Sequence, residues 1–310
     1  MEIFDTIIIG GGPAGLSAGI YAIRSRLKTV MLEKFMPGGQ MVTTDFVENY
    51  PGFPTGIGGI DLSIAMEQQA RGLGLDIRST EVISVDFSAE EKIVNTQEGE
   101  LRALTVILAT GATPRTLDIP GEERLRGKGV SYCATCDGAF FRDKNVVVVG
   151  GGNTAVQDAV FLARFAATVK IIHRRDALRA TKILQERALK NDKIEFIWNS
   201  VLKKIDGKNS VEKIVILNVE TKEQSAFPID GVFVLIGTDP NTIFLKDHIA
   251  LDPSGYILTD EEMRTSIKGI YAAGDCRRKG LRQMVTAAAD GAIAAVAAEQ
   301  YIESLNDRML

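Results

Sequence analysis

Residues 5–15 read DTIIIGGGPAG, and this stretch decides the fold. The β-branched run before the glycines predicts a buried strand, and the apolar periodicity of residues 16–26 predicts a helix. A second strand is expected over residues 29–33, TVMLE. A strand, a glycine-rich turn, a helix and a second strand with short connections form a βαβ unit.

The three glycines of this turn have the spacing of a dinucleotide-binding fingerprint. Gly10 would make the tight turn, Gly12 would let a pyrophosphate approach the backbone, and Gly15 would let helix and strand pack closely. The phosphates would lie at the helix N-terminus. Glu33, at the end of the second strand, can accept hydrogen bonds from a ribose hydroxyl. A structural turn beside a solvated Glu is the alternative, but it leaves the coincidence of these features unexplained.

The same pattern returns at residues 145–155, NVVVVGGGNTA. We expect strands over 145–149 and 168–172 and a helix over 156–165. The interval from Gly150 to His173 equals the interval from Gly10 to Glu33. A second repeat, TGATP at 110–114 and IGTDP at 236–240, follows an apolar strand in each copy. The repeats indicate that a whole nucleotide-binding domain has been duplicated.

The C-terminal stretch should complete the first copy, with a strand over 269–275 and a helix over 282–303. The sequence therefore predicts an α/β fold with two Rossmann-like dinucleotide-binding domains, the second inserted into the first. The first would span residues 1–116 plus 245–310, and the second residues 117–244.

The second copy has a basic cluster, formed by His173, Arg174, Arg175 and Arg179, where the first copy has Glu33. Arginine offers planar paired donors that suit a ribose 2′-phosphate, so the cluster favours NADP(H). A solvated basic turn is the alternative. Two dinucleotide sites suggest two cofactors that exchange electrons, with FAD at the acidic copy and NADPH at the basic one.

Composition narrows the class of protein. Lys plus Arg number 36 and Asp plus Glu number 40, giving a net charge of −4, which argues against nucleic acid or an anionic membrane as partner. No apolar run free of charges approaches ~18 residues, and the N-terminus does not read as a secretory signal. Three cysteines are too few for a secreted disulfide scaffold, so we expect a cytoplasmic protein.

Cys133 and Cys136 form a CATC motif followed by Asp137. A disulfide across so short a loop would stabilise the fold by only about 2 kcal/mol. Zinc would need about four ligands, and this chain has one further cysteine and two histidines, so we expect no metal. A redox dithiol is the best interpretation, with Asp137 as a candidate proton donor. Cys276 is expected to be a small buried residue, and the basic residues 277–279 a solvated turn.

Together these motifs resemble the low-molecular-weight thioredoxin reductases over essentially the whole chain. The matching stretches are GGGPAGLSA (10–18), GGQM (38–41), ENYPG (48–52), ATGA (109–112), CATCDG (133–138), GGGNTA (150–155), HRRDALRA (173–180), AGD (273–275) and RQ (282–283). The cysteine pair just ahead of the second glycine turn is the most specific of them.

The resemblance implies an FAD-dependent, NADPH-dependent thioredoxin-disulfide reductase and a homodimer. Cys136 would face the flavin, Cys133 would exchange with thioredoxin, and Asp137 would be the general acid. The predicted FAD residues are Gly10, Gly12, Pro13, Ala14, Gly15, Glu33, Lys34, Gly39, Gln40, Asn49, Thr110, Gly111, Gly274, Asp275, Arg282, Gln283, Met284 and Ala287. The predicted NADPH residues are Gly150, Gly152, Asn153, Thr154, His173, Arg174, Arg175 and Arg179.

Two other interpretations stay open. The same fold could reduce a glutaredoxin-like or peroxiredoxin partner, or take electrons from ferredoxin, although the intact second glycine turn and its arginines argue against ferredoxin. A protein of another class, a flavin- and nucleotide-binding sensor with the dithiol as switch, would show no steady turnover with NADPH.

Overall fold

The computed structural model describes residues 3–44 and 46–306. The chain forms two compact units, one made of the described residues up to Thr113 and from Asp239 onward, the other of Pro114–Thr238. The expected boundaries, after residues 116 and 244, lie a few residues further along the chain. The two crossings are β7 (Ala112–Pro114) and β16 (Thr238–Pro240), which pair as a two-stranded sheet.

The first unit is built on a seven-stranded sheet. Its elements are β1 (Ile3–Ile9), α1 (Pro13–Arg24), β2 (Thr29–Glu33), η1 (Gly39–Thr43), α2 (Gly59–Gly72), β3 (Asp76–Ser79), β4 (Val82–Asp86), β5 (Lys92–Thr96), β6 (Gly99–Leu108), η3 (Ile243–Leu245), β17 (Ile270–Ala272), η4 (Gly274–Cys276) and α6 (Met284–Asn306). The strand order is β3-β2-β1-β6-β5-β4, and β17 pairs with the end of β6. β3, β2, β1, β6 and β17 run parallel, whereas β4 and β5 are antiparallel additions.

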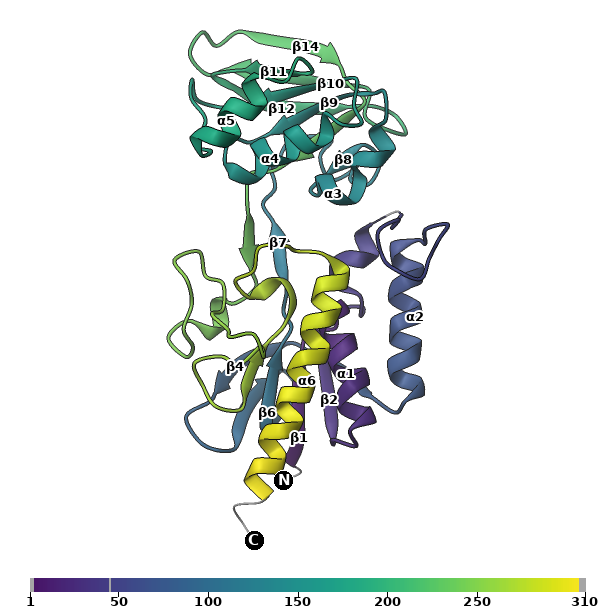
Figure 1. Ribbon diagram of the computed structural model, residues 1–310, viewed down its shortest axis with the longest axis vertical. Coiled ribbons are helices and arrows are strands. Elements are labelled where there is room, and N and C mark those ends of the chain that lie inside the picture. Colours follow the sequence, from purple (N-terminus) through teal and green to yellow (C-terminus); the bar gives the residue numbers. More distant parts are fainter. Residues whose placement is uncertain (1–2, 45, 307–310) are drawn as a thin grey trace. The chain divides into compact units, whose positions relative to one another are not determined.

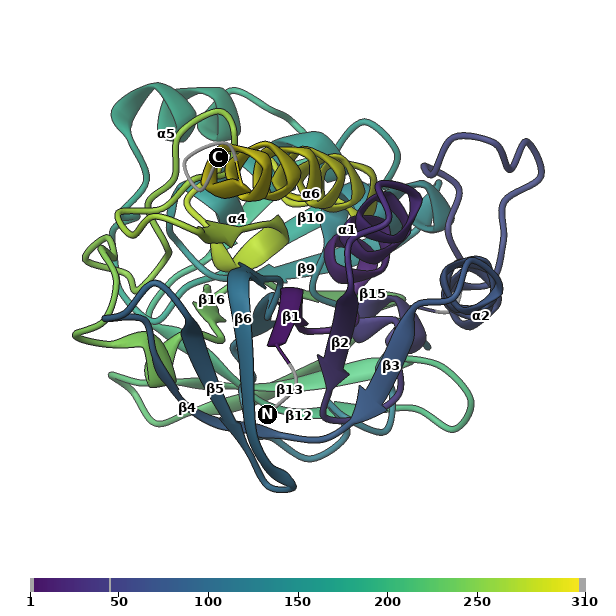
Figure 2. The ribbon, with the colours of Figure 1, turned by 90° about the horizontal axis from the view of Figure 1, so that it is seen from below.

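Side chains alternate across this sheet. Ile8, Met31 and Ile107 point into a core formed with α1, α2 and α6, and Ile7 and Val106 point into the core on the opposite face. α1 and α6 lie side by side on one face of β1 and β6 (Figures 1 and 2). α6, which begins at Met284, therefore completes a unit that begins with β1 at Ile3.

The second unit repeats this plan. Its elements are β8 (Val130–Ser131), α3 (Ala134–Asp137), η2 (Gly138–Phe141), β9 (Asn145–Val149), α4 (Asn153–Leu162), β10 (Thr168–Ile172), α5 (Lys182–Leu189), β11 (Ile194–Ile197), β12 (Ser200–Asp206), β13 (Lys213–Asn218), β14 (Gln224–Pro228) and β15 (Gly231–Val234). β11-β10-β9-β15-β8 form a parallel sheet. One face packs on α4 and α5, and the other on the antiparallel sheet β12-β13-β14.

Several expected elements match the structure, and both fingerprint helices begin earlier than expected. β2, β9 and β10 have the expected bounds, but α1 begins at Pro13 and α4 at Asn153. Proline is accepted at the first position of a helix because its missing N–H would have no partner there. The last residues of each glycine turn are therefore the first turn of the helix. None of the helices in the described ranges is long and apolar enough to cross a bilayer.

The contact between α1 and the turn before it predicts a difference between two glycine variants. A Cβ on Gly15 would lie 1.8 Å from the carbonyl oxygen of Gly10, whereas a Cβ on Gly72 would meet nothing within 4 Å. We expect Gly15→Ala to lower the free energy of unfolding by about 1–3 kcal/mol or more. The control Gly72→Ala should leave it unchanged or raise it by up to about 1 kcal/mol. Urea unfolding followed by circular dichroism measures both, and equal stability of the two variants would contradict the close packing.

Candidate functional site

The first glycine turn has the geometry that a pyrophosphate needs. Gly10 has a φ of +105°, and a Cβ there would lie 2.4 Å from the Ala109 carbonyl oxygen, so the turn needs glycine. A Cβ on Gly12 would meet nothing within 4 Å, so this residue faces open space. Gly12 is also the N-cap of α1, and no side chain caps the helix there. The first backbone amides of α1 are therefore available for an anion.

Glu33 lies against this turn. Its carboxylate accepts hydrogen bonds from the backbone N–H groups of Gly11 (2.6 Å) and Phe35 (2.9 Å). A carboxylate can accept about four hydrogen bonds, so it retains capacity for ribose hydroxyls. The neighbouring Lys34 instead pairs with Glu81 through its ammonium group, at 2.6 Å.

The segment 38–40 also packs on the first turn. The Gly38 N–H donates to the Gly11 carbonyl at 2.7 Å, and a Cβ on Gly39 would lie 3.3 Å from the Gly12 Cα. The Gln40 side chain donates to the carbonyl of Ala112. The structure thus brings Gly39 to the predicted phosphate site, although the sequence separates them by more than 20 residues.

Two further groups of predicted FAD residues meet in the first unit. The Asn49 side-chain amide donates to Gln283 at 3.0 Å. Gly274, with a φ of +78°, allows close packing of its turn, because a Cβ there would lie 2.9 Å from the Ala14 Cβ and 3.5 Å from that of Ala287. Met284 begins α6 and packs against the core on the α1 side.

Unpartnered buried polar atoms coincide with predicted cofactor residues. Within the described ranges, five buried side-chain N or O atoms have no hydrogen-bond partner, and four of them belong to predicted cofactor residues. These four are Thr110 Oγ1, His173 Nε2, Asp275 Oδ1 and Arg282 Nε. Such groups normally have partners, and a bound ligand would supply them. The residues present therefore fit a dinucleotide in each unit.

Asp290 is a residue of this region that sequence reasoning missed. The residue is 6% exposed, and its carboxylate accepts hydrogen bonds from Arg277 (2.9 Å), Lys279 (2.7 Å) and the Gly274 N–H (3.0 Å). Burial opposes its ionisation, but the bonds from Arg277 and Lys279 outweigh burial and hold the pKa below its usual value. Asp290 thus anchors the turn that carries Asp275, whose own pKa is raised by burial.

This ion cluster corrects the expectation of a solvated turn at residues 277–279. The side chains of Arg277 and Lys279 are only 15% and 7% exposed, and only Arg278 is exposed as expected. The sequence contains one indication of this ion cluster: Asp290 is the single acidic residue in the Ala-rich run 287–298. Cys276 is fully buried, donates to the Leu108 and Ala273 carbonyls at 3.3 Å, and has a pKa raised by burial to about 11. It behaves as a small core residue.

The second glycine turn repeats the geometry of the first. Gly150 has a φ of +152°, and a Cβ there would lie 2.4 Å from the Leu235 carbonyl oxygen. Gly152, at the N-cap of α4, again faces open space. Asn153 accepts a hydrogen bond from the Thr181 N–H at 2.8 Å, which fixes the chain beyond the arginines, and Thr154 is exposed.

His173 occupies the place that Glu33 has in the first unit. Its ring covers Gly151, where a Cβ would lie 2.3–2.7 Å from imidazole atoms, and it is 5% exposed. Burial, and then Arg179 and Arg175, lower its pKa, so the ring is neutral at pH 7. His173 therefore adds no charge to the basic cluster.

Arg174, Arg175 and Arg179 supply that charge. All three are exposed, and no carboxylate among the described residues pairs with them. The Arg179 N–H donates to the Gly151 carbonyl at 2.8 Å, so the segment folds back over the glycine turn. The arrangement suits an anion on the ribose of a bound nucleotide.

The cysteine pair lies in the same unit as this turn. Cys133 and Cys136 form a disulfide at the start of α3. The Cys136 N–H points to Cys133 Sγ at 3.2 Å, and the Thr135 hydroxyl lies 3.4 Å from it. Asp137, half-buried, donates its N–H to the Cys133 carbonyl at 3.2 Å. In the part of the chain that the structure describes, no three His, Cys, Asp or Glu side chains gather as metal ligands.

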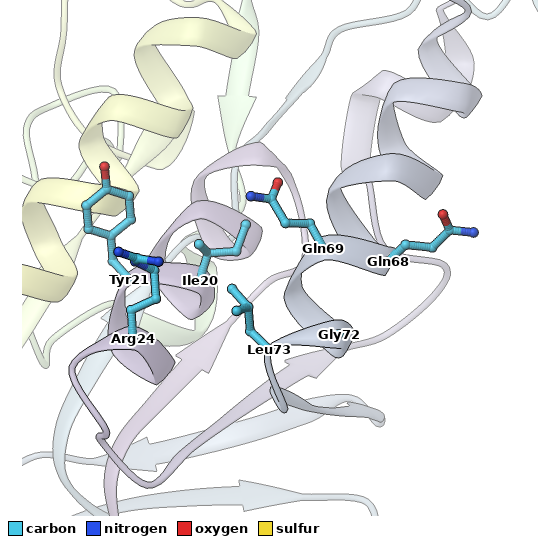
Figure 3. Close-up of a pocket in the computed structure, with 7 residues that line it drawn as sticks. All are labelled: Ile20, Tyr21, Arg24, Gln68, Gln69, Gly72 and Leu73. Atoms are coloured by element: carbon cyan, nitrogen blue, oxygen red, sulfur yellow. The ribbon is translucent and has the colours of Figure 1, made fainter.

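A separate pocket opens between the C-terminal ends of α1 and α2 (Figure 3). It contains none of the predicted site residues, and it is lined by Ile20, Tyr21, Arg24, Gln68, Gln69, Gly72 and Leu73.

Comparison with known proteins agrees with this geometry. The profile of the pyridine nucleotide-disulphide oxidoreductase family matches residues 4–291. Curated thioredoxin reductases from Peptoclostridium acidaminophilum and Bacillus subtilis (strain 168) are 48% and 46% identical, over 98% and 99% of this chain and 98% of each relative. The crystal structure of thioredoxin reductase from Streptococcus pyogenes MGAS5005 is 47% identical, has a TM-score of 0.94, and is matched over 97% of this chain and 99% of that one. The chain belongs to the pyridine nucleotide-disulphide oxidoreductases and, within them, to the bacterial-type thioredoxin reductases.

Proposed function

We propose that this protein uses NADPH and FAD to reduce the Cys133–Cys136 disulfide, which then reduces thioredoxin. The observation that carries the proposal is the disulfide itself, held in the unit that also bears the arginine-flanked glycine turn. Its short loop contributes only about 2 kcal/mol as a staple, so redox exchange explains it better. The relatives named above are thioredoxin reductases, which supports thioredoxin as the substrate.

The contacts of Cys133 support it as the residue that exchanges with the substrate. When the disulfide opens, the Cys136 N–H and the Thr135 hydroxyl are placed to stabilise negative charge on Cys133 Sγ. The Cys133 thiolate would attack one sulfur of the substrate disulfide and form a mixed disulfide. Cys136 would then attack Cys133, release the reduced substrate and restore the pair. Asp137 is proposed to supply a proton to the departing thiolate.

FAD and NADPH are proposed to bind to different units, each through its own set of residues. Bound FAD would accept electrons from NADPH and pass them to the disulfide. In the first unit, the α1 amides would hold its pyrophosphate, Glu33 its ribose, and Asp275 and Arg282 its remaining polar groups. In the second unit, the α4 amides would hold the pyrophosphate of NADPH, and Arg174, Arg175 and Arg179 its 2′-phosphate.

The thiol assignments predict opposite results for three serine variants. Cys133→Ser and Cys136→Ser should abolish thioredoxin reduction while NADPH still bleaches the flavin, because neither cysteine is needed for hydride transfer. Cys276→Ser should retain activity, since its thiol is fully buried with a pKa near 11. The assay is NADPH-dependent reduction of thioredoxin, with flavin absorbance as the second measurement. Turnover by either of the first two variants would refute the dithiol role.

The exposed arginines should determine the choice of coenzyme. Arg174→Ala or Arg175→Ala should each lower kcat/KM for NADPH about ten- to hundredfold, because a charge-assisted hydrogen bond contributes roughly 1.5–3 kcal/mol. The value for NADH should hardly change. Lys190→Ala, which removes an exposed positive charge outside the cluster, is the control and should have no effect. Equal use of NADH and NADPH by the unmodified protein would overturn this assignment.

We also propose a homodimer, supported by an apolar stripe on α6. Val285, Ile293 and Val296 are about 40% exposed and lie on one face with Ala289, opposite the face that packs on α1. A second copy of the chain would cover this stripe. Ile293→Arg should shift the protein toward monomer in sedimentation velocity, whereas Ile183→Arg, at an even more exposed position on α5, should not. A monomeric unmodified protein at micromolar concentration would contradict the proposal.

A further inference from the structure

The only tryptophan of the chain stacks on a phenylalanine at the edge of the second unit's parallel sheet. Phe196, in β11, and Trp198, just after it, have ring centroids 4.9 Å apart and an interplanar angle of 3°. Both residues are partly exposed. A flat aromatic pair at a sheet edge, incompletely covered by the protein, can serve as a platform for another planar ring.

The backbone ties this platform to the basic cluster. The His173 N–H donates to the Ile197 carbonyl at 3.0 Å, and the Asn199 N–H donates to the Arg175 carbonyl at 3.2 Å. These bonds bracket Trp198 on both sides along the chain. The indole therefore belongs to the segment that runs directly beside Arg174 and Arg175.

The platform also lies on the appropriate face of the sheet. Phe196 packs against the core that includes α4 and α5, and Trp198 shares its face because the two rings stack. The glycine turn opens α4 at the carboxyl end of β9, and Trp198 follows the carboxyl end of β11. In an open parallel sheet, a dinucleotide binds outside the carboxyl ends of the strands.

The covalent structure of NADPH limits where its adenine can lie. The adenine and the 2′-phosphate of NADPH are attached to adjacent carbons of one ribose. If the arginines hold the 2′-phosphate, the base lies within reach of the segment around Trp198, whose Asn199 N–H donates to the Arg175 carbonyl. A base stacks on an aromatic side chain whatever its hydrogen-bonding pattern.

We propose that Trp198, supported from behind by Phe196, stacks on the adenine of the nucleotide held by the second unit. The proposal rests on the assignment of the arginine cluster to the 2′-phosphate. Trp198 is then a coenzyme-binding residue, and it contributes affinity without choosing between NADPH and NADH.

Adenosine 2′,5′-bisphosphate is the probe, because it carries the base and the 2′-phosphate but no nicotinamide. Binding to the FAD-loaded protein is measured by calorimetry. Trp198→Ala should weaken binding about five- to hundredfold, and Trp198→Phe should recover most of the affinity. Phe165→Ala, which removes a half-buried aromatic ring at the opposite, amino edge of the sheet, should change nothing. Circular dichroism and flavin content confirm that each variant is folded.

Emission from the protein gives a second measurement, since all tryptophan fluorescence comes from position 198. The probe should change that emission in a saturable way, with the dissociation constant found by calorimetry. Unchanged emission, together with full affinity of Trp198→Ala, would overturn the stacking role even if Arg175→Ala weakens binding. Failure of the unmodified protein to bind the probe, or full affinity of Arg175→Ala, would instead overturn the 2′-phosphate assignment on which the proposal rests.

Discussion

Contact between backbones, with no side chain between them, sets the geometry of the first unit. The Gly15 Cα faces the Gly10 carbonyl on one side of α1, and the Gly291 Cα of α6 faces the Ala14 carbonyl, where a Cβ would lie only 2.0 Å away. α1 therefore packs closely both on the glycine turn that precedes it and on α6. Its position fixes the free amides at its N-terminus, and with them the place where a phosphate can bind.

The two units use one design with different chemistry. In each, a residue at the carboxyl end of the second strand lies over the middle glycine of the GGG turn. Glu33, the last residue of β2, lies on Gly11, and His173, the first residue after β10, lies on Gly151. The Glu33 carboxylate accepts a hydrogen bond from the backbone N–H of Gly11, whereas the neutral His173 imidazole only packs over Gly151. The first unit therefore presents an acceptor at this position. In the second unit, the arginines that follow His173 carry the positive charge that suits an anion.

Sequence patterns predicted most of the fold because they are local. Short, largely apolar runs between turn residues predict β2, β9 and β10 to the residue, and repetition of the fingerprint indicates the duplication. The pattern predicts helix starts that are too late, because glycine and proline are typical of turns, yet Pro13 and Gly15 lie in the first turn of α1. A local pattern indicates that a tight turn is present. It does not indicate which residues belong to the turn and which ones begin the helix.

Burial of polar residues could not be predicted, because it depends on distant segments. Arg277 and Lys279 read as a solvated turn, yet Asp290, from the middle of α6, neutralises them in the interior. His173 read as part of a basic cluster, yet packing on Gly151 keeps it neutral. Trp198 lies more than 20 residues from Arg174 and Arg175 in the sequence, and the pairing of β10 with β11 brings its segment beside them.

The insertion of one unit into the other has a consequence for biosynthesis. Residues 114–238 form the second unit as a continuous segment, whereas the first unit needs β17 and α6 from the far end of the chain. On the ribosome, the nucleotide-binding unit with the cysteine pair is complete before α6 has been translated. Until then, the apolar faces of α1 and β6 that α6 and β17 cover stay open to solvent. The nascent first unit is therefore the part of the chain that exposes unfolded surface longest during synthesis.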